Sequence, residues 1–153
     1  MKKIVYINGY KGQNSKKAKL FKEKLNAIHI VLNDQFNTIE VCEQLNLIKP
    51  DIIIASSTGC YVADCCEYDD GIFVYLNPLI DLDDLAKLTD VSSLRELTRK
   101  DKNTIVLVNE DDELLDYKKA IKMYNNIKIF KYGGHRFKNI EDLMKVILEL
   151  IKE

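Results

Sequence analysis

Six short runs rich in isoleucine and valine alternate along the chain with segments of helical periodicity, and this alternation restricts the fold more than any other feature. Several runs are apolar throughout, as expected for strands buried on both faces of a parallel sheet. The expected strands are Lys3–Ile7, Ala27–Leu32, Asp51–Ala55, Gly71–Leu76, Thr104–Val108 and Ile127–Tyr132. The expected helices are Ser15–Asn26, Asn37–Lys49, Gly59–Tyr68, Asp116–Asn125 and Ile140–Lys152, with one or two short helices in the less regular stretch Asp81–Lys100. Asn37 and Glu40 have the spacing of a capping box.

Strands that alternate with helices predict right-handed crossovers and a parallel sheet covered by helices on both faces. The fold class is therefore α/β, a three-layer αβα sandwich with a mostly parallel sheet of about six strands. The chain has 153 residues, with no repeat and no linker rich in proline, glycine or serine. One domain spanning residues 1–153 is expected, and it is long enough to bury a substantial core.

Charge and composition exclude several classes of partner. The formal net charge is −1, which gives no electrostatic reason to expect nucleic acid or a membrane surface. No apolar run approaches the roughly 20 residues of a membrane span. The N-terminal lysines precede a stretch too short for a signal peptide, which predicts a cytoplasmic protein. The four cysteines are Cys42, Cys60, Cys65 and Cys66, and none forms a CxxC pair, so we expect reduced thiols, no metal and no cofactor.

Polar residues follow the predicted strands at the edge where functional residues of such sheets gather. Ser57 follows the third strand, a run of acids from Glu110 follows the fifth, and His135 follows the sixth. A hydroxyl, an acid and a histidine thus occur in the order of the triad of α/β-hydrolases.

The stretch around Ser57 permits two interpretations. Ser57 is the cap of an ordinary strand-to-helix turn, or it is a nucleophile on a tight elbow. The elbow needs small residues two positions before and two after the nucleophile, and Ala55 and Gly59 satisfy this.

The sequence indicates the candidate histidine more clearly than the candidate acid. His135 follows two glycines, which permit backbone bends that can turn its imidazole over the sheet edge. The other histidine, His29, lies inside a predicted strand, where a structural role is the better interpretation. Among the acids we favour Asp112, because the run Asp-Glu-Leu-Leu leaves an acid at the turn and apolar residues beyond it to anchor the next segment, and Asp111 is the first substitute. Backbone N–H groups of Thr58 and Tyr10 are the expected oxyanion hole.

Five stretches in order resemble a known family. They are YINGY, ASSTGCY, YLNP, NEDDELLDYKKA and GGHRF, at residues 6–10, 55–61, 75–78, 109–120 and 133–137. The set resembles the small, lidless bacterial esterases of the YqiA-like group in the alpha/beta-hydrolase superfamily, over nearly the whole chain. The resemblance implies a minimal alpha/beta-hydrolase fold without a large lid. It also implies Ser57 as nucleophile, Asp112 as acid, His135 as base and the Tyr10 N–H as an oxyanion donor.

The chain departs from the pattern of that group at four places. Asn8 stands where the group has histidine, Ala55 replaces the first glycine of the elbow, and Cys60 replaces the second glycine after the nucleophile. The aspartate that usually precedes the catalytic histidine is missing, so Gly134 stands there. None of these changes removes a reacting group.

The function expected from these residues is a serine hydrolase, a carboxylesterase or thioesterase that cleaves small, short-acyl esters through an acyl-enzyme. The residues proposed to line an open, shallow site are Asn8, Gly9, Tyr61, Asn77 and Pro78, although Tyr61 fits the core equally well. One alternative is a catalytically silent relative that acts as a binding or regulatory module. Another is a flavodoxin-like or nucleotide-binding domain with a phosphate at the loop Gly9–Gly12, which is neither GxGxxG nor a P-loop.

Overall fold

The computed structural model describes residues 1–89 and 103–153 of the chain. Its six strands form one sheet, in which every neighbouring pair is parallel. The strands are β1 (Ile4–Ile7), β2 (Ile28–Ile30), β3 (Ile52–Ser56), β4 (Ile72–Leu76), β5 (Thr104–Asn109) and β6 (Ile127–Phe130). The helices are α1 (Lys16–Leu25), α2 (Thr38–Ile48), α3 (Thr58–Cys65), α4 (Leu82–Leu88), α5 (Tyr117–Met123) and α6 (Ile140–Lys152). All six predicted strands are present, and the three-layer α/β class is confirmed.

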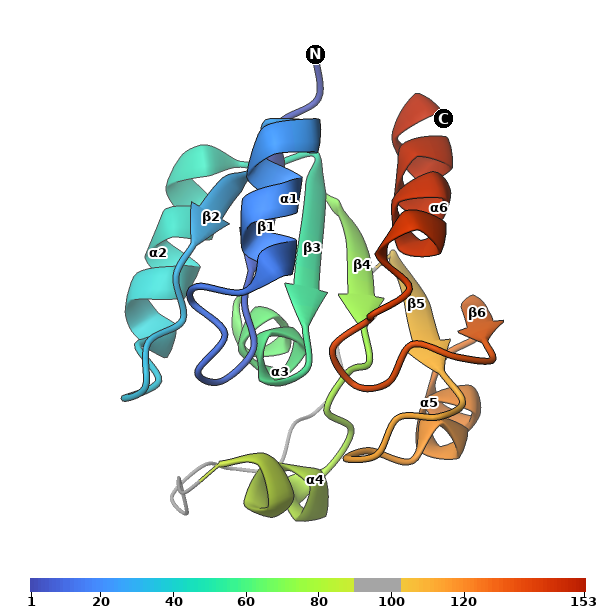
Figure 1. The fold of residues 1–153 in the computed structure, drawn as a ribbon. Coiled ribbons are helices and arrows are strands. Elements are labelled where there is room, and N and C mark those ends of the chain that lie inside the picture. The colour runs from blue at the N-terminus through green and yellow to red at the C-terminus, as the bar shows by residue number, and fades with distance from the viewer. Residues whose placement is uncertain (90–102) are drawn as a thin grey trace.

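The strand order is β2-β1-β3-β4-β5-β6, so the chain reverses its direction across the sheet between β1 and β3. The loops after β1 and β3 therefore leave the sheet edge in opposite directions, and ligands of open parallel sheets bind at such a point. In Figure 1 these loops lie at the lower end of the sheet, and both chain termini lie at the opposite end.

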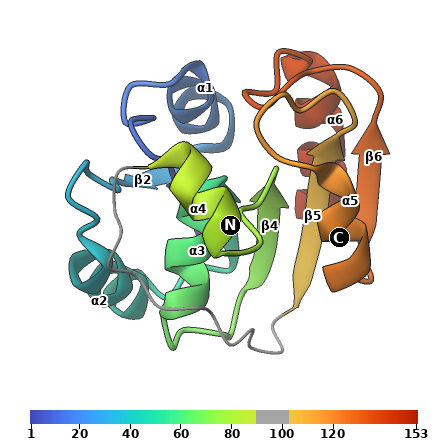
Figure 2. The ribbon, with the colours of Figure 1, turned by 90° about the horizontal axis from the view of Figure 1, so that it is seen from below.

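Two layers of helices cover the sheet, one on each face (Figures 1 and 2). Alternate strand residues point to opposite faces. Val5 and Ile53 belong to the core beneath α2, α3 and α5, whereas Ile4 and Ile52 belong to the core beneath α1 and α6. Both faces are thus dry, which explains the uninterrupted apolar runs in the sequence.

Strand β2 is shorter than the predicted run Ala27–Leu32. Near Leu32 a side chain takes the place of the backbone hydrogen bonds that would continue the pairing with β1. Asn8, directly after β1, accepts a hydrogen bond from the Leu32 N–H at 2.9 Å and donates to the Leu32 carbonyl at 2.9 Å. Its amide oxygen also lies 2.9 Å from Nε2 of His29. His29 thus has the structural role expected of it.

The helices differ from the predicted segments mainly at their ends. The Asn37 side chain makes no capping bond to α2, because it accepts from the Asn33 N–H at 2.8 Å and donates to the Val31 carbonyl at 3.0 Å. The prediction of a capping box at Asn37 and Glu40 is therefore wrong, because the Asn37 side chain instead closes the loop before α2. Helix α3 ends at Cys65, short of the predicted Tyr68.

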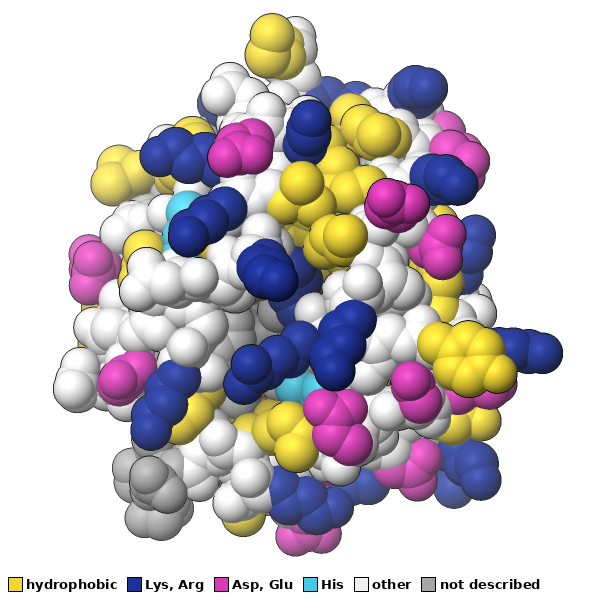
Figure 3. Space-filling view, in the orientation of Figure 1, with side chains coloured by type: hydrophobic (Ala, Val, Ile, Leu, Met, Phe, Trp, Pro, Cys, Tyr) yellow, Lys and Arg dark blue, Asp and Glu magenta, His cyan; other side chains and the backbone are white. Residues whose placement is uncertain are grey.

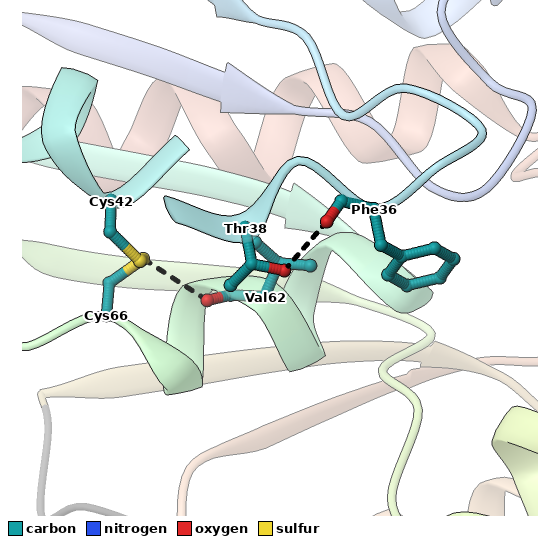
Figure 4. The surroundings of a disulfide bond; sticks show 5 residues. All are labelled: Phe36, Thr38, Cys42, Val62 and Cys66. Carbon is teal, nitrogen blue, oxygen red and sulfur yellow. Dashed lines mark hydrogen bonds between the residues drawn. A yellow bond between two sulfur atoms is a disulfide. The ribbon is translucent and has the colours of Figure 1, made fainter. Parts of the chain in front are cut away.

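A disulfide joins α2 to the end of α3, contrary to the prediction of four reduced thiols. Cys42 and Cys66 are 24 residues apart, and the packing of α2 against α3 brings their Cα atoms to 5.0 Å (Figure 4). Spacing along the chain does not show this approach. The Cys66 sulfur also lies 3.2 Å from the carbonyl oxygen of Val62, to which it could donate only as a thiol.

Helix α4 lies over the carboxyl edge of the sheet and is tied to α5. The Lys119 ammonium donates to Asp81 and Asp84, each at 2.9 Å, and these bonds raise the pKa of Lys119. The rest of the predicted helical stretch Asp81–Lys100 lies outside the described residues from position 90 onward. None of the helices in the described ranges is long and apolar enough to cross a membrane.

Candidate active site

Ser57 stands on a sharp turn between β3 and α3. Its backbone has φ 52° and ψ −115°, a conformation that side chains rarely adopt and that costs on the order of 1–3 kcal/mol. The Ser57 N–H donates to the Leu76 carbonyl at 3.0 Å, which fixes the turn against the end of β4. Ser57 occupies the N-cap position of α3, yet its side chain makes no capping hydrogen bond. The geometry is that of a nucleophile elbow rather than of a helix cap.

Glycine is required at position 59 by the closeness of β1. A Cβ added there would lie 2.6 Å from the Asn8 carbonyl oxygen and 2.7 Å from that of Ile7, both backbone atoms. Ala55, on the other side of the elbow, is fully buried. The small residues that pointed to an elbow are therefore explained by the space around it.

The His135 imidazole connects Ser57 with Asp112. Its Nε2 lies 3.0 Å from Ser57 Oγ, and its Nδ1 lies 2.8 Å from Asp112 Oδ2. The His135 side chain is 10% exposed and that of Asp112 is 2% exposed. The Asp112 carboxylate also accepts the N–H groups of Leu114 and Leu115, each at 2.9 Å, and these bonds fix its orientation. A hydroxyl, an imidazole and a carboxylate in this chain of contacts have the geometry of a catalytic triad.

The acids on either side of Asp112 hold the backbone of the histidine loop. Asp111 accepts from the N–H groups of Gly134 at 2.8 Å and Gly133 at 3.2 Å. These hydrogen bonds, that from Gly134 most, lower the pKa of Asp111. Glu113 accepts from the His135 N–H at 3.0 Å. The acidic run is therefore a support for the histidine loop, and in this structure Asp112 rather than Asp111 contacts the imidazole.

The two predicted oxyanion donors lie next to each other. Thr58 is the first residue of α3, so its N–H has no partner within the helix. The Tyr10 N–H donates to the hydroxyl of Thr58. To bind an oxyanion, the Tyr10 N–H would have to leave the Thr58 hydroxyl or donate to both acceptors at once.

The residues predicted to line the pocket are mostly interior. Tyr61 belongs to the core beneath α2 and α3 and is 3% exposed, which agrees with its alternative interpretation. Asn8 is fully buried and Pro78 is buried as well. Gly9 is partly exposed beside the elbow, where an added Cβ would lie 3.4 Å from the Ser57 Cβ. Of this set, Gly9 is the one placed to border the site.

Solved structures share this architecture, whereas no family model and no curated protein matches the sequence. A candidate hydrolase of the alpha/beta superfamily from Xanthomonas campestris pv. campestris has a TM-score of 0.69 and 14% identity, over 99% of both chains. A second X. campestris protein, described as an α/β serine hydrolase without a lid, has a TM-score of 0.64 and 12% identity, over 99% of this chain and 82% of its own. Mouse alpha/beta hydrolase domain-containing protein 10 has a TM-score of 0.60 and 14% identity, over 97% of this chain and 89% of its own.

This chain has the alpha/beta-hydrolase fold. At these identities the likeness concerns the fold. It is a small version of that fold, and the described residues contain no separate lid domain.

Asparagines that the sequence did not single out as supports position the histidine loop of this alpha/beta-hydrolase fold. Asn77, 3% exposed, donates to the carbonyl oxygens of His135 at 2.9 Å and Gly134 at 3.1 Å. It also accepts from the Asn109 N–H at 3.0 Å, and the Asn109 amide donates to the Gly134 carbonyl at 2.8 Å. Asn77 therefore supports the loop from beneath rather than lining a pocket. The sequence feature that could have indicated this role is the asparagine at the end of each of two adjacent strands, Asn77 directly after β4 and Asn109 at the end of β5.

Removing the Asn77 amide is expected to lower kcat about 10- to 100-fold with little change in KM, because the loop that carries His135 loses two donors. Unfolding in urea should show a loss of about 1–3 kcal/mol from the unpaired buried groups. The variant is Asn77→Ala, assayed on a short-chain ester. Tyr68→Phe is the matched control, because the Tyr68 hydroxyl also ties the backbone, donating to the Pro50 carbonyl at 2.6 Å just before β3, at the end of the sheet opposite the site. It should lose stability and keep kcat, and an equal fall in kcat in both variants would contradict the positioning role.

Proposed function

We propose that this protein is a serine hydrolase that cleaves small, short-acyl carboxylic esters or thioesters. The observation that carries the proposal is the single imidazole, His135, within hydrogen-bond distance of both Ser57 Oγ and Asp112. The resemblance of its five motifs to the YqiA-like esterases supports the same substrate class, and the folds of its structural neighbours are consistent with it.

In the proposed reaction, Ser57 Oγ attacks the acyl carbon while His135 Nε2 takes its proton. The carbonyl π electrons move to oxygen, where the Thr58 N–H and the Tyr10 N–H stabilise the charge. Asp112 holds the imidazolium formed at that moment. The tetrahedral intermediate collapses, the leaving alkoxide or thiolate receives the proton from His135, and an acyl-Ser57 remains.

Water then repeats the sequence on the acyl-enzyme. His135 takes a proton from the water, whose oxygen attacks the acyl carbon, and the proton returns to Ser57 Oγ as the carboxylic acid leaves. Each half of the reaction uses the same three side chains and the same two backbone N–H groups. Within the described residues, no cluster of three or more His, Cys, Asp or Glu side chains is arranged to hold a metal.

A panel of 4-nitrophenyl esters and acyl thioesters of increasing chain length tests the activity. We expect turnover to be greatest for the short chains, with an initial burst of 4-nitrophenol as the acyl-enzyme accumulates. A folded protein that hydrolyses no member of the panel would support the second candidate, a silent relative that acts as a binding or regulatory module. The contact of the Tyr10 N–H with the Thr58 hydroxyl is the observation that favours this second candidate.

A further inference from the structure

A buried ammonium group lies beside the histidine loop. Lys17, the second residue of α1, is 9% exposed, and its Nζ donates to the Arg136 carbonyl at 3.2 Å. Arg136 directly follows His135, so this ammonium contacts the loop that carries the imidazole. Nζ also lies 5.8 Å from the centroid of the Phe137 ring, which offers only weak compensation for its charge.

No carboxylate in the described residues lies within ion-pair distance of this ammonium. A buried charge without an opposite charge is costly. Burial accordingly lowers the pKa of Lys17 to about 8, which leaves the group largely protonated at neutral pH. The nearby Asp112 carboxylate is hydrogen-bonded to His135 and to two backbone N–H groups, and it forms no ion pair with Lys17.

Other positive groups lie close to Lys17, and no ion pair within the described residues neutralises its charge. Lys17 lies in the first turn of α1, which has no acidic residue there and whose dipole disfavours a cation. The neighbouring residue is Lys16. Burial is the largest cause of the lowered pKa of Lys17; among the nearby groups Arg136 lowers this pKa further, whereas Cys60 and Asp112 raise it. Figure 3 shows Lys and Arg side chains gathered around a hollow in the middle of this face, beside a histidine.

A positive hollow next to a reactive serine selects for negatively charged ligands. His135 contacts Ser57 Oγ at 3.0 Å, and the carbonyl that accepts from Lys17 belongs to the next residue, so the ammonium is bound one residue along the chain from the imidazole. Arg136 is exposed and can turn its guanidinium toward a carboxylate or phosphate.

We propose that Lys17 and Arg136 form an anion-binding subsite, and that the substrate is an ester or thioester carrying a carboxylate or phosphate near the scissile bond. This inference rests on the proposed hydrolase function. The anion can belong to the acyl part or to the leaving group, and matched esters distinguish the two.

The test compares kcat/KM for esters that differ only in charge. For the acyl side, the pair is the 4-nitrophenyl monoester of succinic acid and its methyl-capped counterpart. For the leaving-group side, the pair is 4-acetoxybenzoate and its methyl ester. We expect the wild type to favour the anionic member of at least one pair by about 10- to 100-fold, and the preference to shrink as salt is added.

Lys17→Met keeps the apolar stem and removes the charge, and it should reduce this preference about tenfold or more. Arg136→Gln, at an exposed position, is a second variant that does not depend on core packing and should also reduce it. Lys24→Met, on an exposed turn at the far end of the same helix, is the matched control and should leave the preference unchanged. Equal rates for charged and neutral esters in the wild type, or an unchanged preference in both site variants, would overturn the proposal.

Failure of the hydrolase function can be separated from failure of the subsite. If the wild type hydrolyses no ester, calorimetric titration with succinate tests whether the subsite binds an anion, because this measurement needs no turnover. Binding to the wild type that is weakened in Lys17→Met would support the subsite alone. An absence of binding to the wild type would reject it.

Discussion

Replacing Ser57 by alanine is expected to lower kcat for short-chain esters by about 10⁵-fold or more. The loss is large because Ser57 Oγ forms the bond to the acyl carbon, and no other group in the triad can take its place. Alanine keeps the Cβ, so the elbow and its contact with Leu76 should remain. Thermal unfolding followed by circular dichroism should accordingly be close to that of the wild type.

Ser56 provides the control for this substitution. It precedes Ser57 in the chain, but its Oγ accepts a hydrogen bond from the buried Tyr6 hydroxyl at 3.0 Å and does not contact His135. Ser56→Ala should change kcat only a few-fold. Equal losses in Ser56→Ala and Ser57→Ala, with both proteins folded, would mean that the loss comes from the turn and not from a missing nucleophile.

Asp112→Asn is expected to lower kcat by about 10⁴-fold. The carboxylate holds the proton of the imidazole on Nδ1, which leaves Nε2 free to take the proton of Ser57. An amide can donate to Nδ1 instead, which favours the wrong tautomer and leaves the imidazolium without a negative charge beside it. The measurement is kcat on the same ester, with folding checked by urea unfolding.

Asp111→Asn is the matched control because the two acids are adjacent and differ in what they contact. Asp111 accepts backbone N–H groups of Gly133 and Gly134, and one amide oxygen can keep the shorter of these bonds. We expect a loss of no more than about tenfold. A large loss in Asp111→Asn together with a small one in Asp112→Asn would assign the triad acid to Asp111.

The sheet could be predicted from the sequence because both of its faces are buried. Strands such as β3 and β4 then appear as uninterrupted apolar runs, and their alternation with helices fixes a parallel arrangement. The ends of the elements were harder to predict. β2 stops where the Asn8 side chain takes over the pairing of Leu32, a contact between residues far apart in the chain.

Two members of the proposed triad had clear signals in the sequence, and the third did not. Ser57 was marked by the small residues that its turn needs, and His135 by the glycines before it. The choice of Asp112 rested on weaker grounds, since all the neighbouring acids have the same chemistry. Their different partners depend on how the loop after β5 crosses the loop after β6.

Contacts between distant segments account for what the sequence did not show. Asn77 supports the backbone of a loop more than fifty residues away, and its residue type alone is equally suited to lining a pocket. The disulfide partners Cys42 and Cys66 meet only after α2 packs on α3. That Lys17 has no ion-pair partner among the described residues likewise appears only in the folded chain.

Labelling with a fluorophosphonate, followed by intact mass spectrometry, tests most directly whether Ser57 is an activated nucleophile. The probe phosphonylates a serine hydroxyl whose proton a neighbouring base removes. We predict one adduct per wild-type chain, none on folded Ser57→Ala, and much slower labelling of Asp112→Asn. A folded wild type that acquires no adduct, or a Ser57→Ala variant labelled as fast as the wild type, would contradict the proposed catalytic serine.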